Sequence, residues 1–150
     1  MMSSEKCSVC TDGGLCRREV VRDGRCVFHL QNKTAEEANQ FEKMFFSELE
    51  RLKEHSSPYI DLSAFVFPRP IEFSGHVFRR IVLFDKAVFE GEMSFVGCTF
   101  VGEASFRRTR FKEKARFESV FRRRADFGGA RFEKGVGFSK AVFCGPKCFQ

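Results

Sequence analysis

The stretch from Phe84 to Phe106, FDKAVFEGEMSFVGCTFVGEASF, decides the fold of this 150-residue chain. Its phenylalanines follow one another at steps of five, six, five and six residues. The same alternation runs from Leu62 to Phe149 through seventeen centres, with one shorter step of four residues between Phe117 and Phe121. A period of this kind predicts a repeat architecture in which every unit places one large side chain in a common core.

The residue two positions before each centre is usually small or aliphatic, as at Ala87, Ala104 and Ala115, and the residue between is mostly polar. This alternation has the two-residue period of an extended strand, and it lasts only a few residues before a turn. A continuous helix is excluded because a five-residue step rotates a helix by about 500°, which places successive phenylalanines on different faces. Residues 59–150 are therefore predicted to form an all-β solenoid.

The units ADFGG, ARFEKG, VGFSK and AVFCGP, between Ala125 and Pro146, resemble those of the pentapeptide-repeat proteins, in which a small residue, a variable residue and a central Leu or Phe recur. The resemblance implies a right-handed quadrilateral β-helix of about four coils, each unit forming one side with strands stacked at about 4.8 Å. The six-residue steps predict one extra residue at every second corner. The left-handed hexapeptide helix of acyltransferases is the alternative solenoid, but it needs aliphatic centres at a uniform step of six.

The first segment, residues 1–32, contains Cys7, Cys10, Cys16, Cys26 and His29. Zinc prefers thiolate and imidazole ligands, and a two-residue gap lets one turn present two of them. Cys26 and His29 form such a pair, and the other two ligands are either Cys7 with Cys10 or Cys10 with Cys16. Because a segment this short has little core of its own, we predict that it folds around a structural zinc ion.

Residues 34–55, TAEEANQFEKMFFSELERLKEH, open with Thr34 and have Glu37 three positions later, which is the capping-box arrangement of a helix start. Apolar residues recur along one face at helical spacing: Ala38, Phe41, Phe45, Leu49 and Leu52. We therefore predict an amphipathic helix. Its apolar face is expected to cover the open first coil of the solenoid rather than to bind a partner, since repeat folds need a cap.

Charge is unevenly distributed, because residues 1–100 carry 13 basic and 15 acidic side chains whereas residues 101–150 carry 13 and 5. The family members that protect type II topoisomerases resemble DNA and need an acidic surface, so this chain has the wrong sign for that role. Residues about one coil apart are expected to face each other as ion pairs: Glu90 with Lys112, Glu92 with Lys114, and Glu113 with Lys134. The basic residues left unopposed are predicted to flank a single wall: Lys86, Arg108, Arg110, Arg122, Arg123 and Arg131.

These features predict a non-enzymatic scaffold that presents a wall of the β-helix to a protein partner. No catalytic residues are predicted, because the sequence contains neither a phosphate-binding glycine loop nor a plausibly ordered Ser/His/Asp arrangement. The alternative function is a zinc-assisted binder of nucleic acid or another polyanion through the basic face. An uncovered last coil ending at Phe149 has two explanations: either the chain is part of a longer repeat protein, or two copies form a homodimer through that coil, which we expect for the chain as given.

The location of the protein is predicted from its apolar segments and its cysteines. No stretch approaches the roughly 18 apolar residues of a membrane span, and the start lacks the apolar core of a signal peptide. Four cysteines crowded beside one histidine suit a metal site in a reducing compartment better than a disulfide framework. We therefore expect a cytoplasmic protein with no membrane partner.

Overall fold

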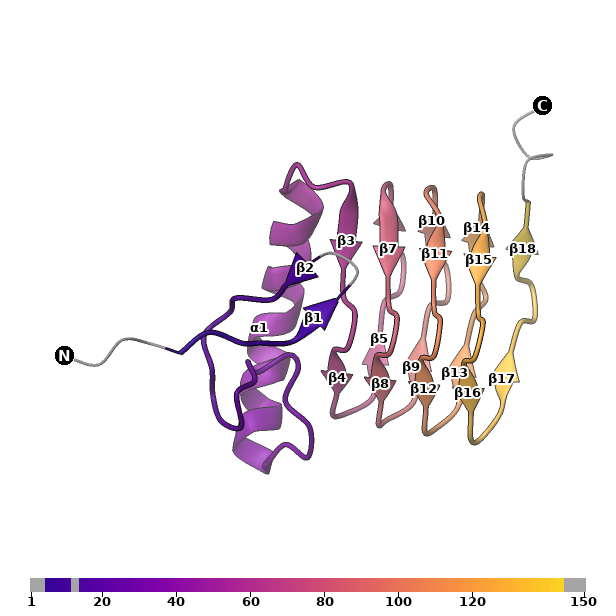
Figure 1. Ribbon diagram of the computed structural model, residues 1–150. Coiled ribbons are helices and arrows are strands. Elements are labelled where there is room, and N and C mark those ends of the chain that lie inside the picture. The colour runs from indigo at the N-terminus through magenta and orange to yellow at the C-terminus, as the bar shows by residue number, and fades with distance from the viewer. Residues whose placement is uncertain (1–4, 12–13, 145–150) are drawn as a thin grey trace.

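The chain folds into a solenoid of short parallel strands with a helix packed against one end (Figure 1). The structure is a computed structural model and describes residues 5–11 and 14–144. A small antiparallel hairpin of β1 (Cys10–Thr11) and β2 (Gly14–Leu15) comes first, followed by helix α1 (Ala35–Glu54). Within the described ranges, no helix is both long and apolar enough to cross a membrane.

The strands of the solenoid form four parallel sheets of four strands each, which we call walls 1 to 4. Wall 1 consists of β3 (Tyr59–Asp61), β7 (Ile81–Leu83), β11 (Ala104–Ser105) and β15 (Ala125–Asp126). Wall 2 consists of β4 (Val66–Phe67), β8 (Val88–Phe89), β12 (Arg110–Phe111) and β16 (Arg131–Phe132). Wall 3 consists of β5 (Ile71–Glu72), β9 (Met93–Ser94), β13 (Ala115–Arg116) and β17 (Val136–Gly137). Wall 4 consists of β6 (Val77–Phe78), β10 (Thr99–Phe100), β14 (Val120–Phe121) and β18 (Val142–Phe143).

Consecutive strands belong to walls 1, 2, 3 and 4 in turn, and the next strand belongs to wall 1 again. One coil therefore contains one strand of each wall. Thr99 in β10 pairs with Val77, 22 residues earlier, and with Val120, 21 residues later. The shorter coil contains the four-residue step between Phe117 and Phe121. The predicted β-solenoid of about four coils is therefore confirmed, whereas its right-handed winding stays a prediction.

The two step lengths correspond to two kinds of corner. Each five-residue step is a β-turn in which an amide donates back to the carbonyl of the centre, as Ala87 does to Phe84 at 3.0 Å. The third residue of these turns has a positive φ, as type II turns require: Ala64, Gly75, Lys86, Gly97, Arg108, Gly129 and Lys140. Every second corner lacks this five-residue turn and contains the extra residue of a six-residue step, as the sequence predicts.

The core consists of phenylalanine rings stacked from coil to coil. In the column of wall 2, the ring centroids of Phe67, Phe89, Phe111 and Phe132 are separated in turn by 4.4, 5.1 and 4.7 Å, and the rings are nearly parallel. Edge-to-face contacts join neighbouring columns. All twelve centres from Leu62 to Phe121 are fully buried, so the inward phase of the repeat is confirmed.

Gly102 lies at a six-residue corner where adjacent coils come very close. A Cβ atom at this position would lie 2.6 Å from the carbonyl carbon of Arg80, a backbone atom that cannot easily move aside. Gly102→Ala is therefore expected to lower the free energy of unfolding by about 1–3 kcal/mol through overpacking. Gly137→Ala is the control, because nothing lies within 4 Å of its Cβ position. Chemical denaturation should show a change below about 0.5 kcal/mol for the control, and equal costs would contradict the close approach.

Helix α1 begins with the predicted capping box, in which the Thr34 hydroxyl accepts from the Glu37 amide and the Glu37 carboxylate accepts from the Thr34 amide. Its apolar face lies on the first coil. The ring of Phe45 packs edge-to-face on Phe67 and Phe73, with centroid separations of 5.1 and 5.8 Å. Phe41 makes a similar contact with Phe67 at 5.4 Å. The helix therefore caps the phenylalanine columns, as expected.

The C-terminal end of α1 is held by Arg80, which lies between β6 and β7. The last carbonyl groups of a helix lack partners within the helix. The Arg80 guanidinium donates to the carbonyl of Leu52 at 2.9 Å and to that of Ser57 at 2.6 Å, and also to those of Lys53 and His55. One side chain thus joins the end of the helix to the solenoid.

Replacement of Arg80 tests this connection. Arg80→Met is expected to lower the free energy of unfolding by about 1.5–3 kcal/mol, because hydrogen bonds to a charged donor are lost and several carbonyls are left unpaired. The neighbouring Arg79 is exposed, so Arg79→Met should change stability by less than about 0.5 kcal/mol. Urea denaturation of both variants measures the difference, and similar losses would refute the proposed role of Arg80.

Candidate metal centre

The backbone of the N-terminal segment brings distant cysteines together. The Cys7 amide donates to the Arg18 carbonyl at 2.6 Å, and the Cys16 amide donates to the Val9 carbonyl at 3.0 Å. This pairing continues the hairpin of β1 and β2 and places Cys7 near Cys16. Farther along the chain, a turn closed by the His29 amide and the Cys26 carbonyl, 3.2 Å apart, presents Cys26 and His29 together.

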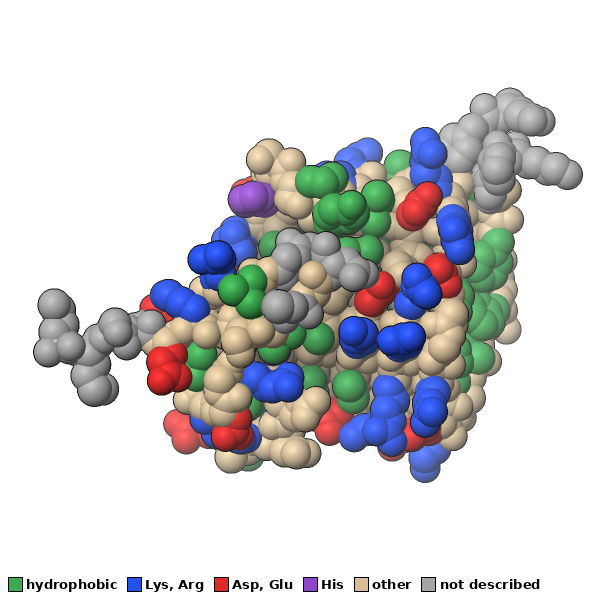
Figure 2. Space-filling model, in the orientation of Figure 1, with side chains coloured by type: hydrophobic (Ala, Val, Ile, Leu, Met, Phe, Trp, Pro, Cys, Tyr) green, Lys and Arg blue, Asp and Glu red, His purple; other side chains and the backbone are tan. Residues whose placement is uncertain are grey.

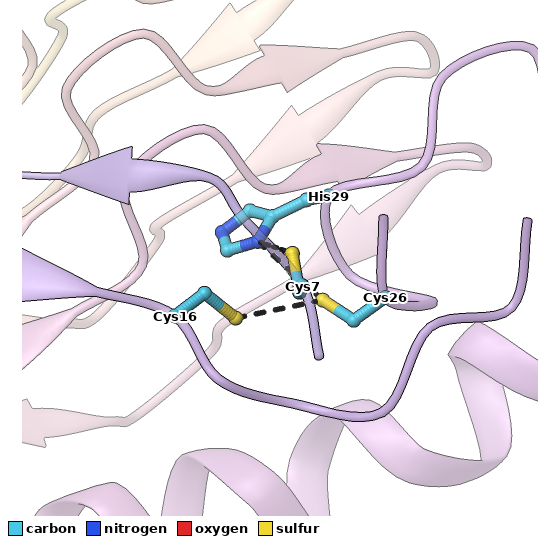
Figure 3. A group of neighbouring side chains, drawn as sticks. All are labelled: Cys7, Cys16, Cys26 and His29. Carbon is cyan, nitrogen blue, oxygen red and sulfur yellow. Dashed lines mark hydrogen bonds between the residues drawn. The ribbon is translucent and has the colours of Figure 1, made fainter. Parts of the chain in front are cut away.

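Cys7, Cys16, Cys26 and His29 form one compact cluster (Figure 3), in which all four ligand atoms lie within 4.8 Å of one another. The His29 Nδ1 atom is 3.4 Å from the sulfur of Cys7 and 3.4 Å from that of Cys26, and the sulfurs of Cys16 and Cys26 are 3.8 Å apart. A tetrahedral zinc ion with Zn–S of about 2.3 Å and Zn–N of about 2.0 Å separates sulfurs by about 3.8 Å and sulfur from nitrogen by about 3.5 Å. The cluster therefore has the dimensions of a four-ligand metal site.

The imidazole of His29 is oriented by the first coil. Its Nε2 atom lies 3.0 Å from the carbonyl oxygen of Ser63. A carbonyl can only accept, so Nε2 carries the proton and Nδ1 presents its lone pair to the three sulfurs. Such an outer hydrogen bond is a common feature of histidine ligands in metal sites. Through it, the N-terminal segment is joined directly to the solenoid.

The surroundings of the cluster favour thiolate. The pKa of the Cys16 thiol is lowered, first because Cys26 donates a hydrogen bond to it and then because the cationic Arg18 donates to it as well, while burial opposes the shift. The bond with Cys16, together with burial, raises the pKa of Cys26. The Arg18 guanidinium lies 3.3 Å from the Cys16 sulfur and also pairs with Glu48 in α1 at 2.7 Å. A divalent cation can take the place of the proton that the two sulfurs share.

The predicted ligands differ in one respect from the cluster. Sequence reasoning placed Cys10 in both ligand sets and treated Cys7 and Cys16 as alternatives, whereas the structure brings Cys7 and Cys16 together with the pair of Cys26 and His29. The side chain of Cys10 lies outside the described part of the chain. The reason for the difference is the hairpin register, which brings residues nine apart into one site and is not encoded by ligand spacing.

Four of the six predicted basic residues flank wall 1, and the other two lie on wall 2, so the six do not flank a single wall as predicted. Lys86 and Arg108 occupy the same turn in successive coils, at the corner between walls 1 and 2. Arg122 and Arg123 lie at the corner between walls 4 and 1. The remaining two, Arg110 and Arg131, are neighbours on adjacent strands of wall 2. The Arg110 guanidinium forms an ion pair with the Glu133 carboxylate at 2.8 Å. Figure 2 shows Lys and Arg side chains spread over the coils with acidic side chains between several of them.

Comparison with known protein families identifies the repeat. Residues 73–120 match the family model described as pentapeptide repeats (9 copies). These coils are pentapeptide repeats. The pentapeptide-repeat solenoid continues on both sides of the matched residues, because β3 to β5 before them and β15 to β18 after them extend the same four walls. Comparison with the curated proteins and with the solved structures finds no match.

Proposed function

We propose that this chain is a non-enzymatic pentapeptide-repeat scaffold that binds a protein partner through wall 4. The supporting observation is a column of β-branched side chains that crosses all four coils on its outer surface. Val77, Thr99, Val120 and Val142 are paired in register along this column. The end members Val77 and Val142 are 39% and 48% exposed. Contiguous exposed apolar surface of this kind is typical of sites that contact another protein.

The structure of wall 4 suits such contact. Exposed arginines, Arg79 and Arg122, each follow a strand of the column, and a polar rim around an apolar strip is the usual composition of a protein interface. The inward residues that follow Val77, Thr99 and Val120 are fully buried phenylalanines, so these outer residues are held at the spacing of the strands. A surface already fixed in this way loses little conformational entropy on binding.

We further propose that the cluster of Cys7, Cys16, Cys26 and His29 binds one structural zinc ion. Four protein ligands complete a tetrahedral shell and leave no open position for a substrate, as in structural zinc sites. The ion would hold the N-terminal segment together. The hydrogen bond from His29 to Ser63 would then fix that segment against the first coil.

The binding function is tested by capture of a partner from a cell extract, with the captured proteins identified by mass spectrometry. The native chain is expected to retain a specific protein, and the double variant Val77→Lys/Val120→Lys is expected to lose it. Val88→Lys introduces the same change at a half-buried, outward position on wall 2 and serves as control. If the double variant keeps the partner, or the control loses it equally, wall 4 is not the binding surface.

The alternative function, binding of a polyanion, rests on Lys86 and Arg108, which project from equivalent turns of successive coils. Phosphate neutralisation makes such binding strongly dependent on salt. Retention on a heparin column that falls steeply with salt, and that is lost in Lys86→Glu/Arg108→Glu, would favour this function over the protein scaffold.

A second copy of the chain is proposed as a further partner through the last coil. Phe143 is 54% exposed, whereas Phe121, its neighbour in the same column, is completely buried. The predicted contact residue Phe149 lies outside the described residues. Phe143→Lys is therefore expected to shift a dimer toward the monomer in analytical ultracentrifugation, because it places a charge in an apolar contact. A chain that is monomeric at every concentration would contradict the dimer.

A further inference from the structure

A groove of about 740 Å³ runs along the outer surface of wall 3, a different face from the one assigned to the protein partner. It crosses all four coils, since residues of β5, β9, β13 and β17 line it. Small residues form its floor: Ala115 and Ser94 are buried, and Gly137 has no side chain. The groove therefore follows the axis of the solenoid and crosses the strands.

The charges that line this groove are separated along its length. The two early coils contribute Glu72 and Glu92, and the two later coils contribute Lys114, Arg116 and Lys134. All five side chains are exposed. Glu72 and Arg116 belong to one outward column, because both pair with Ser94 from opposite sides. One half of the groove is thus acidic and the other half is basic.

These charges are not neutralised by one another. Among the described residues, the expected ion pairs of Glu92 with Lys114 and of Glu113 with Lys134 are not formed, and the closest carboxylate to Arg116 is that of Glu118 at 3.9 Å. On wall 2, by contrast, charged side chains of neighbouring coils do form ion pairs. There, Lys112 binds Glu90 at 3.5 Å and Arg110 binds Glu133 at 2.8 Å. Wall 3 consequently has unpaired charge of both signs along a concave surface, with Glu72 and Glu92 on one side and Lys114 and Lys134 on the other.

We propose that the groove of wall 3 binds an extended peptide segment that is acidic at one end and basic at the other. The acidic end lies over Lys114, Arg116 and Lys134, and the basic end lies over Glu72 and Glu92. Four strands stacked at about 4.8 Å span roughly 14 Å, which an extended chain at about 3.3 Å per residue covers with about five residues. A polyanion does not fit as well, because Glu72 and Glu92 would repel half of its length.

Two synthetic peptides of identical composition test the proposal. In EEGSKK the charges are separated, and in EKGSEK they alternate. With fluorescence-labelled peptides at low salt, the native chain is expected to bind EEGSKK about tenfold more tightly than EKGSEK, since a difference of about 1.4 kcal/mol is the sum of two or three exposed ion pairs. Lys114→Glu/Lys134→Glu should abolish this preference. Lys86→Glu/Arg108→Glu makes the same change of charge near wall 1 and should keep it.

Several results would overturn the proposal. Equal binding of the two peptides, or tighter binding of the all-acidic EEGSEE, would show that the separated charges are not recognised. A change of sedimentation in Lys114→Glu/Lys134→Glu, without any peptide preference in the native chain, would assign the groove to a second copy of the chain. Unfolding curves of Lys114→Glu/Lys134→Glu and Lys86→Glu/Arg108→Glu that coincide with the curve of the native chain show that both variants are folded. Val77→Lys/Val120→Lys should retain the peptide preference, so the groove and the partner site on wall 4 can fail independently.

Discussion

Loss of the proposed zinc ion is expected to unfold the N-terminal segment while the pentapeptide-repeat coils remain folded. Apparent binding free energies of structural zinc sites are about 10–16 kcal/mol in small peptides, which exceeds any other single contribution available to this segment. The coils depend instead on their own stacked phenylalanines. Purified protein should therefore contain one zinc per chain. After chelation, hydrogen exchange should become fast at the hydrogen-bonded backbone amides of the N-terminal segment, such as those of Cys7 and Cys16, and stay slow in β7 to β14.

Matched cysteine variants separate the metal site from general effects of cysteine replacement. Cys26→Ser removes a buried ligand and should abolish zinc retention. Cys98→Ser is the control, because Cys98 is equally buried but lies in the solenoid, where its thiol donates to the Phe73 carbonyl at 2.7 Å. A serine hydroxyl can make the same bond, so this variant should keep both the zinc and the slow exchange. A metal-free native chain with a protected N-terminal segment would refute the site.

The sequence predicts the solenoid well because every unit repeats the same local pattern. A small residue, a polar residue and a phenylalanine define which side chains point inward, and the step length defines the corner. The capping box of Thr34 and Glu37 is likewise a local pattern. Such features need no knowledge of distant contacts, and the structure confirms them.

Other features depend on segments that are far apart in the chain, and the sequence does not predict them. The link between His29 and Ser63 spans 34 residues, and Arg80 reaches carbonyls 23 to 28 residues before it. No local pattern marks either contact. The missing ion pairs on wall 3 have a similar origin, because the register predicts which charges are neighbours but not whether their flexible side chains meet.

Truncation of a central phenylalanine is expected to have the largest effect within the coils. Phe106 stacks between Phe84 and Phe127, with centroid separations of 5.0 Å on both sides, and it is completely buried. Phe106→Ala removes a ring from the middle of its column and leaves a cavity that neighbouring coils cannot close without breaking their strand pairing. We expect a loss of about 3–5 kcal/mol in the free energy of unfolding.

Arg108→Ala tests whether this loss reflects the inward phase of the repeat. Arg108 is only two residues away but is exposed, and its positive φ is adopted by Ala64 at the equivalent turn of the first coil. Its replacement should therefore cost less than about 0.5 kcal/mol. Urea denaturation followed by circular dichroism measures both variants. Because residues of neighbouring coils are coupled through the stacked rings, Phe106→Ala should also shift the unfolding of the coils on both sides, and comparable losses for the two variants would mean that the inward positions have been misassigned.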